Sequence, residues 1–408
     1  MNILGIVAEY NPFHNGHAYQ LKKSKEITGS DAAVAVMSGN YVQRGTPAVI
    51  DKWMRTKIAL LNGIDLVIEL PSVYSISSAE FFSFGAISLL NSIGIVKSIC
   101  FGSETDSIEL LQFAASVFTD ETADYKELLK LELKKGLSFP CARYEAFKKV
   151  MHGERNMCID ENQANQMLNS SNDILGIEYI KSLIKLKSTI KPYCIKRIGS
   201  SYNAQNIEGI YSSASALRNF MQNINDFNIL KDYLPYESMK IINELHEKNY
   251  NFAYEDKMLP YIKYKYYMNK NSLKKLPDVK EGIENRIYKY IPQAESMDEL
   301  IEKVKTKRYT YTRISRILCQ WFAGFDMFDI PKMRKEECPY ARVLGFNEKG
   351  RSILKLMKSN SSIPIYTKLP HMKNDTLNLD LQSSKAYTLL NKNSDCFDDY
   401  KKGPIIIN

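Results

Sequence analysis

Near its start the chain reads Ile3-Leu4-Gly5-Ile6-Val7-Ala8 and continues directly with Glu9-Tyr10-Asn11-Pro12-Phe13-His14-Asn15-Gly16-His17. The first segment predicts a short buried strand, and the second predicts a proline-containing turn that leads into a polar helix. His14 and His17 are three residues apart, so both imidazoles lie on one face of that helix. The helix start offers unpaired N–H groups and a partial positive charge, and Gly16 lets a ligand approach the backbone. These features predict a phosphate site, most simply for the triphosphate of a nucleotide.

A zinc site is the obvious competing interpretation of the two histidines. Zinc needs at least three protein ligands, and no cysteine, histidine or acidic residue stands at a plausible zinc spacing near His14 and His17. The sequence His14-Asn15-Gly16-His17, placed directly after a strand, is instead similar to the His-x-Gly-His signature of the nucleotidyltransferase superfamily, which includes the class I aminoacyl-tRNA synthetases. We therefore expect no metal-ligating side chains here.

Length and composition are those of an ordinary globular protein of two or three domains, with 408 residues of which 44% are hydrophobic and 25% charged. No apolar run is long enough for a transmembrane helix, and the first residues lack the basic start and unbroken apolar stretch of a signal peptide. The seven cysteines are scattered and form no Cys-x-x-Cys pair, which is typical of reduced thiols. We expect a cytoplasmic protein with no membrane partner, and the sequence leaves its oligomeric state open.

Positive charge is concentrated in the C-terminal half of the chain. Up to Phe220 there are 23 Lys and Arg against 22 Asp and Glu, whereas the remaining residues hold 32 against 24. Sixteen of the 26 tyrosines also lie after Phe220. Cations bind phosphates and aromatic rings stack on unpaired bases, so a basic, tyrosine-rich half indicates a nucleic acid partner.

The first 105 residues alternate short apolar segments with helical patterns. Strands are predicted at Ile3–Ala8, Ala32–Met37, Asp65–Leu70 and Ser98–Phe101, and helices at His17–Thr28, Asp51–Asn62 and Ser77–Asn91. Asp51 and Ser77 are the expected N-caps, and Gly63 and Gly94 are the expected helix ends. This order predicts an α/β fold with a doubly wound, Rossmann-like parallel sheet, whose ligand lies at the carboxyl ends of the strands.

After this unit the pattern changes twice. Residues 106–190 are predicted to form a mainly helical insertion, and a strand at about Lys191–Arg197 then returns to the sheet. Residues 1–222 are therefore the expected nucleotide-binding, catalytic domain, and residues 223–408 the expected mainly helical, basic domain. Within the latter, residues 340–408 are less regular, which indicates short strands or a loosely packed tail.

Further segments place polar side chains where phosphates or a nucleoside would lie. Ser213-Ala214-Ser215-Ala216-Leu217-Arg218 opens a predicted helix, so its hydroxyls and guanidinium can hold terminal phosphates. Gly102 follows a strand and lets an adenine or ribose lie against the backbone. Asn172 starts another helix, either as an N-cap or as an amide that reads a base. Arg197 ends the late strand, where a cation can reach phosphates or ribose, and Arg44 is a candidate for substrate contact.

Several motifs together resemble the bacterial tRNA(Met) cytidine acetate ligases. They are Val7–His17, Met37–Gly45, Phe101–Glu104, Asn172–Tyr179, Arg197–Gly199 and Ser213–Arg218, and Arg342–Asn347 is similar to the C-terminal part of that family. The likeness covers most of the chain. It departs from the family at Ser215, where threonine is usual, and at Asp173, where a second asparagine is usual. Neither change removes a charge that catalysis needs.

The resemblance implies an ATP-dependent ligase with a nucleotidyltransferase-like N-terminal domain. Such an enzyme activates acetate as acetyl-adenylate, releases pyrophosphate, and passes the acetyl group to the exocyclic amine of the wobble cytidine of elongator methionine tRNA. Its substrates are ATP, acetate and that tRNA, with Mg²⁺ as the expected cofactor. The expected catalytic residues are His14, His17 and Arg218. The residues expected to contact ATP are Val7, Ala8, Glu9, Tyr10, Asn11, Pro12, Phe13, His14, Asn15, Gly16, His17, Ala18, Tyr19, Gln20, Gly102, Asn172, Arg197, Ile198, Ser213 and Ser215.

Two segments of the C-terminal half, Tyr261–Tyr267 and Lys303–Arg316, are predicted to contact tRNA because they mix cations, hydroxyls and rings. Their candidate residues are Lys263, Lys265, Lys305, Lys307, Arg308 and Arg313. Two other functions stay open on the sequence: a nucleotidyltransferase that acts on a phosphorylated metabolite, and a non-catalytic protein that binds ATP and RNA. The first leaves the basic half without a role, and the intact His-x-Gly-His motif argues against the second.

Overall fold

The computed structural model describes the chain apart from residues 121, 138, 154–160, 199–212, 224–225 and 372–373. One sheet lies at its centre, with strand order β10-β8-β5-β2-β1-β6-β7, and β9 pairs with β8. Its strands are β1 (Ile3–Ala8), β2 (Ala32–Ser38), β5 (Leu66–Leu70), β6 (Ser98–Ser103), β7 (Lys191–Lys196), β8 (Ala341–Phe346), β9 (Ile365–Tyr366) and β10 (Ile405–Ile406). The predicted strands β1, β2, β5, β6 and β7 are therefore confirmed, to within two residues at their ends.

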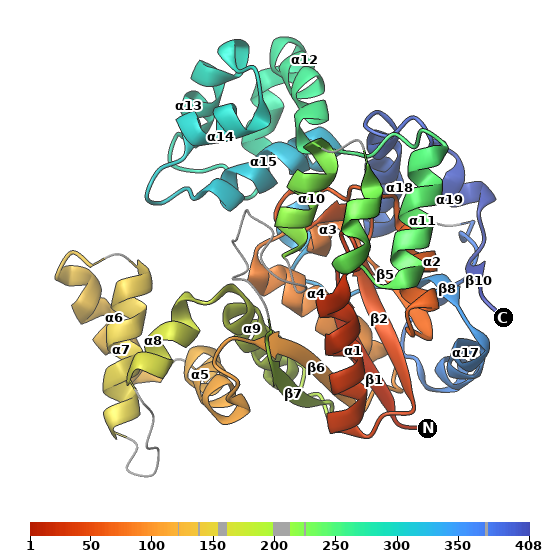
Figure 1. Cartoon of the computed structure of the whole chain (residues 1–408). Coiled ribbons are helices and arrows are strands. Elements are labelled where there is room, and N and C mark those ends of the chain that lie inside the picture. The colour runs from red at the N-terminus through yellow and green to blue at the C-terminus, as the bar shows by residue number, and fades with distance from the viewer. Residues whose placement is uncertain (121, 138, 154–160, 199–212, 224–225, 372–373) are drawn as a thin grey trace.

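Parallel pairing dominates the sheet, as predicted. β1 pairs in parallel with β2 and β6, β5 pairs with β2, and β7 pairs with β6. β8 is different because it runs antiparallel to β5, with Leu66 opposite Phe346 and Glu69 opposite Arg342. Strands β1, β6 and β7 all end on the same edge, where α1 and α9 begin (Figure 1).

Alternate residues of the central strands enter two different hydrophobic cores. Ile3 and Val34 belong to one core, and Leu4 and Ala35 belong to the other. Helices cover both faces of the sheet (Figure 1), which explains why the strands are apolar throughout. The first core includes side chains of α4 (Ala79–Ser92), α5 (Ile108–Asp120) and α9 (Ser171–Lys185), and the second those of α1 (Asn15–Thr28), α2 (Lys52–Leu61), α10 (Ala214–Asn223) and α11 (Tyr236–Glu247).

The predicted helix ends are mostly confirmed. Asp51 caps α2 by accepting two backbone N–H bonds of 2.9 and 3.1 Å. Gly63 and Gly94 follow α2 and α4 with φ of +97° and +73°, the left-handed conformation that ends a helix. The prediction for Ser77 is wrong. Its hydroxyl donates to a carbonyl of the preceding short helix α3 (Ser72–Ser75) at 2.7 Å, and Ser78 occupies the N-cap position of α4.

Residues 106–190 form the predicted helical insertion between β6 and β7. Besides α5 and α9 it contains α6 (Ala123–Lys134), α7 (Phe139–Gly153) and α8 (Glu161–Asn169). α9 packs against α4, α5 and β6, so the insertion is anchored on the sheet. α6 and α7 pack on each other and extend away from it (Figure 1).

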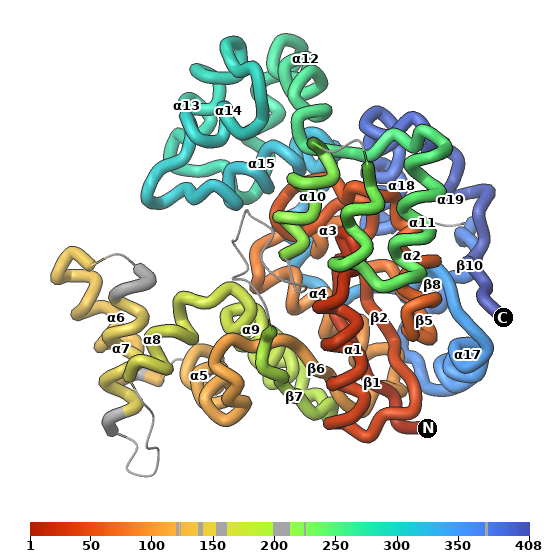
Figure 2. Tube along the Cα trace, viewed as in Figure 1, coloured from red at the N-terminus to blue at the C-terminus, as the bar shows by residue number. Residues whose placement is uncertain are grey.

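Most of the later helices gather in one region beside α10. Figure 2 shows the trace of α12 to α15 at one end of the molecule, far from the helices α6 and α7. α15 also packs against the hairpin of β3 (Tyr41–Val42) and β4 (Thr46–Pro47). The helices of this region are α12 (Leu259–Asn269), α13 (Ile283–Tyr290), α14 (Met297–Val304), α15 (Tyr311–Ala323) and α16 (Ile330–Met333).

Residues 340–408 contain short strands, which is the first of the two alternatives that the sequence left open, and they do not form a loosely packed tail. β8 pairs with β5, and both β9 and β10 pair with β8, so this segment completes the main sheet. α17 (Glu348–Asn360) packs on β2, β5 and β8, and α18 (Asp375–Thr388) packs on α3 and α15. The segment that the sequence groups with the helical domain thus contributes strands to the main sheet.

A buried cluster of charged side chains connects residues 340–408 to α2 and β5. Lys52 Nζ lies 2.7 Å from Glu69 Oε1 and 2.8 Å from Asp399 Oδ1, and the side chain is fully buried. Arg342 Nη1 lies 3.3 Å from Glu69 Oε2, and its Nη2 lies 2.9 Å from Asp399 Oδ1. Two cations face two carboxylates, so the buried charges compensate each other. The cluster joins α2, β5, β8 and α19 (Asp398–Lys401).

Candidate active site

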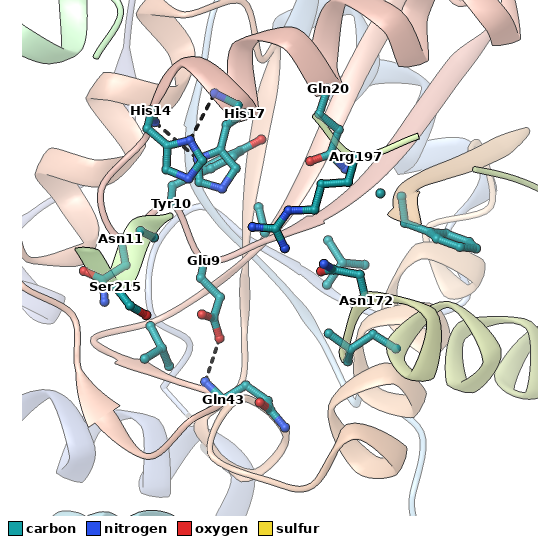
Figure 3. A pocket seen from close by; sticks show the side chains of 18 of the residues that line it. Glu9, Tyr10, Asn11, His14, His17, Gln20, Gln43, Asn172, Arg197 and Ser215 are labelled. Carbon is teal, nitrogen blue, oxygen red and sulfur yellow. Dashed lines mark hydrogen bonds between the residues drawn. The ribbon is translucent and has the colours of Figure 1, made fainter. Parts of the chain in front are cut away.

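A pocket of about 210 Å³ opens where β1, β6 and β7 end, beside the starts of α1, α9 and α10. Figure 3 shows side chains that follow β1 and β7, and side chains of α1, α9 and α10, converging on it. Doubly wound sheets bind ligands at the carboxyl ends of their strands, because loops and helix starts gather there. The pocket therefore lies where the sequence predicts the nucleotide.

His14 and His17 stand side by side on one wall of the pocket (Figure 3), with ring centroids 3.8 Å apart. His14 is the N-cap of α1, so the helix begins at Asn15 rather than at His17 as predicted. His14 Nδ1 accepts a hydrogen bond from Gly16 N at 3.1 Å, and His17 Nδ1 accepts one from His14 N at 3.2 Å. A Cβ on Gly16 would lie 2.9 Å from His14 Cε1, so glycine is needed for this close contact.

These hydrogen bonds determine which nitrogen of each ring carries the proton. Because each Nδ1 accepts, the proton of the neutral ring lies on Nε2, which can donate to a ligand. Burial lowers the pKa of His14 well below its usual value, and the neighbouring imidazole, Arg197 and Arg218 lower it further. Burial also lowers the pKa of His17 to about 3, with a further contribution from Arg197. Both imidazoles are therefore neutral at pH 7.

The turn before His14 is shaped by buried aromatic residues. The Tyr10 and Phe13 rings lie with centroids 4.6 Å apart, and both side chains are buried. Asn11 Oδ1 accepts a hydrogen bond from Val49 N at 2.9 Å, which ties the turn to the neighbouring loop. The buried Arg55 donates to Glu9 O at 2.6 Å and to Ser38 O at 3.1 Å, so it joins the ends of β1 and β2.

Two arginines complete the polar surface of the pocket. Arg218, on α10, donates to Asn11 O at 2.9 Å and to Ser215 Oγ at 3.1 Å, and these bonds orient its guanidinium. Arg197 follows β7, its Nη1 lies 3.9 Å from Glu104 Oε1, and its side chain extends into the pocket (Figure 3). Two guanidinium groups and two imidazole N–H donors around one pocket are complementary to a polyphosphate.

The wall across from the histidines comes from β6 and the start of α9. A Cβ on Gly102 would meet no protein atom within 4 Å, so packing inside the protein does not require glycine there. Asn172 Nδ2 donates to Glu104 Oε1 at 2.6 Å. Asp173 accepts hydrogen bonds from Ser103 Oγ at 2.5 Å and from two backbone N–H groups at 3.1 and 3.2 Å, while burial raises its pKa to about 6. All three partners are donors, so a carboxylate, which only accepts, can take the place of the asparagine that is usual in the family.

Most residues that the sequence assigns to ATP meet in this pocket. Phe13 is buried behind the wall, and Ser213 caps α10 by accepting from Ala216 N at 3.1 Å. Pro12, Asn15 and Ala18 also do not line the pocket, and their contact with ATP stays a prediction. The predicted residues that line it are Val7, Ala8, Glu9, Tyr10, Asn11, His14, Gly16, His17, Tyr19, Gln20, Gly102, Asn172, Arg197, Ile198, Ser215 and Arg218.

Sequence reasoning missed a largely apolar part of the lining. It named Arg44, which does line the pocket, but not the neighbours that surround the polar groups. Most of these neighbours lie inside the motifs at 37–45, 101–104, 172–179 and 213–218, so those motifs could have indicated them. Phe82 and Ile195 look like ordinary core residues in the sequence, and Lys196 looks like a surface cation. The missed residues are Val42, Gln43, Phe82, Phe101, Leu175, Tyr179, Ile195, Lys196 and Ala214.

The residues predicted to contact tRNA lie outside the pocket, on the helical region. Lys263 and Lys265 are on α12. The Nζ atom of Lys265 lies 2.7 Å from both Trp321 O and Asp326 Oδ1, so this side chain holds helices together rather than facing a ligand. Lys305, Lys307 and Arg308 are exposed and lie in the segment before α15. Arg313 lies on α15.

No set of three or more His, Cys, Asp or Glu side chains among the described residues is arranged to hold a metal ion. Both pocket histidines already use Nδ1 to accept backbone hydrogen bonds. None of the helices in the described part of the chain has the length and apolar character needed to cross a membrane.

The chain is similar to known proteins over its whole length. The model of a family described as HIGH Nucleotidyl Transferase matches residues 1–402. A tRNA(Met) cytidine acetate ligase of Clostridium kluyveri is 51% identical over 408 residues, and one of Clostridium novyi is 52% identical over 409 residues, each with 100% of both chains covered. The crystal structure of Thermotoga maritima TmcAL bound with alpha-thio ATP is 34% identical with a TM-score of 0.87, and covers 100% of this chain and 99% of its own. The chain therefore belongs to the tRNA(Met) cytidine acetate ligase family of HIGH nucleotidyl transferases and is an ATP-dependent ligase.

Proposed function

We propose that this enzyme condenses ATP and acetate to acetyl-adenylate and pyrophosphate, and then transfers the acetyl group to the exocyclic amine of the wobble cytidine of elongator methionine tRNA. One observation carries the proposal. A pocket with the donors of a polyphosphate site lies at the carboxyl edge of the sheet, in a chain whose full-length relatives are named for this reaction. A related structure is bound with alpha-thio ATP, which supports ATP as the occupant.

The first step needs stabilisation of negative charge. A carboxylate oxygen of acetate attacks the α-phosphorus, a new O–P bond forms, and the bond to pyrophosphate breaks. Negative charge then grows on the departing pyrophosphate. The Nε2–H groups of His14 and His17, the start of α1 and the guanidinium of Arg218 offset this charge. Arg218 is already oriented by two hydrogen bonds, so little reorganisation accompanies the reaction.

The adenosine part of ATP fits the other wall of the pocket. Gly102 leaves open space beside the end of β6, and Asn172 presents an amide at the start of α9. Arg197 and Ile198 follow β7 on the same side. A nucleoside along this wall places its phosphates between Arg197 and the two histidines, which is the order that the reaction requires.

Mg²⁺ fits this arrangement as an ion bound by the phosphate oxygens of ATP. It prefers an octahedral set of oxygen atoms and keeps several waters when bound to a nucleotide. Of the described residues that line the pocket, only Glu9 carries a carboxylate. Phosphate oxygens would therefore hold the metal, which neutralises part of their charge, while the protein supplies the N–H donors and guanidinium groups.

The helical region is the proposed surface for tRNA. The chain after Phe220 holds 32 Lys and Arg against 24 Asp and Glu, and this excess suits a phosphate backbone. Lys305, Lys307 and Arg308 are exposed on the segment between α14 and α15. Tyr264 and Tyr267, on α12, are 63% and 62% exposed and can stack on unpaired bases.

A single assay tests the proposal. Purified enzyme is incubated with ATP, Mg²⁺, labelled acetate and either elongator methionine tRNA or the same tRNA with uridine at the wobble position. We expect ATP-dependent label only in the cytidine-containing tRNA, and no label with the His17→Ala variant. His246→Ala is the matched control, because His246 stacks on Phe227 outside the pocket. Absence of label from both tRNAs, with ATP consumed on a phosphorylated metabolite, would refute the ligase assignment in favour of a small-molecule transferase.

A further inference from the structure

The pocket contains one group that a polyphosphate site does not need. Glu9 is the sole acidic residue among the described residues that line it. Figure 3 shows its carboxylate pointing away from His14 and His17 and toward Gln43. A carboxylate repels phosphates at short distance, so its place inside this pocket indicates a different binding partner. The sequence groups Glu9 with the ATP-binding residues, and its direction in the structure separates it from them.

Among the residues that the structure describes, only one oxygen of Glu9 has a hydrogen-bond donor. Oε1 accepts a bond from Gln43 N at 2.6 Å. No described residue donates a hydrogen bond to Oε2, and Glu9 lines the pocket. Burial raises the pKa of this carboxyl, while the Gln43 N–H and the charges of Arg218, Arg44 and Arg55 act in the opposite direction. Glu9 is half-buried, so its free oxygen has limited access to water, and a ligand with an N–H group can supply the missing donor.

The turn between β3 and β4, whose backbone N–H binds Glu9, packs on the basic helical region. Gln43 and Arg44 lie in the turn between β3 and β4. Ser315 Oγ, on α15, donates to Gly45 O at 3.0 Å, and a Cβ on Gly45 would overlap the backbone of Arg316. The loop and the helix are therefore in direct contact. The Glu9 carboxylate is thus bonded to the turn that joins the pocket to the helical region, where the proposed function places the nucleic acid.

We infer that Glu9 binds the exocyclic amine of the acceptor cytidine and accepts its proton during acetyl transfer, an inference that rests on the proposed function. The amine nitrogen attacks the carbonyl carbon of acetyl-adenylate, and a C–N bond forms. The C–O bond to AMP breaks, and AMP leaves with that electron pair. The amine proton passes to Glu9 Oε2 and then to water. A carboxylate is the usual protein acceptor for the amino group of cytosine.

The adenine of ATP also carries an amino group, so it is the competing source of the same donor. The two sources differ in the step at which they need Glu9. An adenine contact acts on ATP binding and adenylate formation, before any tRNA is present. A cytidine contact acts only on the transfer. The two steps can be measured separately, because hydroxylamine traps acetyl-adenylate as a hydroxamate without tRNA.

The test compares wild-type enzyme with Glu9→Gln in both assays. Glutamine retains a carbonyl oxygen for the Gln43 N–H but does not accept a proton. We expect hydroxamate formation within about 3-fold of wild type, and kcat for tRNA acetylation lower by about 100-fold or more. The KM for tRNA should change little, which a merely structural role would not predict. Glu26→Gln, an exposed change on α1, is the matched control and should leave both rates unchanged.

The outcomes are distinct. Equal loss of both activities in a Glu9→Gln protein with wild-type melting behaviour would assign Glu9 to the ATP step and overturn the inference. Full retention of tRNA acetylation would overturn it as well. A wild-type enzyme that forms no hydroxamate from ATP and acetate would instead refute the proposed function, and the inference would fall with it. Loss of acetyl transfer alone would establish the role of Glu9.

Discussion

The Gly102→Ala variant tests whether the open space beside Gly102 belongs to the ligand or is needed for packing inside the protein. Gly102 lies in β6, and a Cβ there would have no protein atom within 4 Å. Its φ is not in the left-handed region, so alanine can adopt the same backbone. Replacing glycine at such a position stabilises a protein by about 0.4–1 kcal/mol, because the unfolded chain loses freedom. The melting temperature of the variant should therefore stay the same or rise.

The same methyl group should weaken ATP binding. It occupies the open space at the wall where we place the nucleoside, and an added methyl group in a filled site costs about 1–3 kcal/mol. That free energy corresponds to a dissociation constant for ATP that is about 5 to 150 times higher. Isothermal titration calorimetry with ATP and Mg²⁺ measures the dissociation constant, and thermal unfolding without ligand measures the stability.

Gly85→Ala is the opposite case and serves as the control. Gly85 lies in α4, and a Cβ there would lie 2.5 Å from Tyr74 Cβ. This variant should lose about 1–3 kcal/mol of stability through overpacking while the folded fraction binds ATP as wild type does. An unchanged ATP affinity in Gly102→Ala would refute our placement of the nucleoside. A large loss of stability in Gly102→Ala would refute the claim that its Cβ space belongs to the ligand.

Three further predictions concern stability and RNA binding. Lys52→Met should lower the free energy of unfolding in urea by about 3–5 kcal/mol, because two buried carboxylates lose a cation, and a loss below about 1 kcal/mol would contradict this. Without ATP, stability should fall as pH decreases below 6.5, because folding lowers the pKa of both pocket histidines and the unfolded chain binds more protons. Urea unfolding at several pH values should show a weaker fall when asparagine replaces His14 and His17. Finally, Lys305, Lys307 and Arg308 can be replaced together by glutamine. This change should raise the KM for tRNA and leave hydroxamate formation unchanged. It should also reduce the slope of log binding constant against log salt concentration by about one per lost contact.

The part of the fold that the sequence predicts best is the part whose signals are local. β1 and β2 are buried on both faces, so each shows an unbroken apolar run of its own. His14, Gly16 and His17 lie within one helical turn, and their mutual contacts depend only on that turn. The polar side of the pocket follows from these two facts, because the loops after parallel strands meet at one edge.

The part that the sequence does not predict depends on contacts between distant segments. β8 joins the sheet through β5, and its opposite residues are about 270 positions away, as in the pair Glu69 and Arg342. Nothing in the residue pattern of β5 or β8 indicates that the two strands pair with each other. The apolar lining has the same difficulty, because Phe82 and Phe101 belong to a helix and a strand whose apolar residues are otherwise core. Which core residue reaches the pocket is decided only by how those elements pack.

Burial, together with the positive charge of the pocket, explains why its histidines are neutral. Arg197 and Arg218 are always charged, and two imidazolium ions between them would repel both guanidinium groups and each other. The stacked rings, 3.8 Å apart, avoid this by remaining neutral, while their Nε2–H groups still point outward as donors. A bound triphosphate adds negative charge, but the Nδ1 atoms of both rings already accept backbone N–H bonds, so the rings stay neutral and donate through Nε2. The pocket can therefore fold without two further positive charges and still present fixed N–H donors where the reaction develops negative charge, which is where electrostatic stabilisation accelerates a reaction.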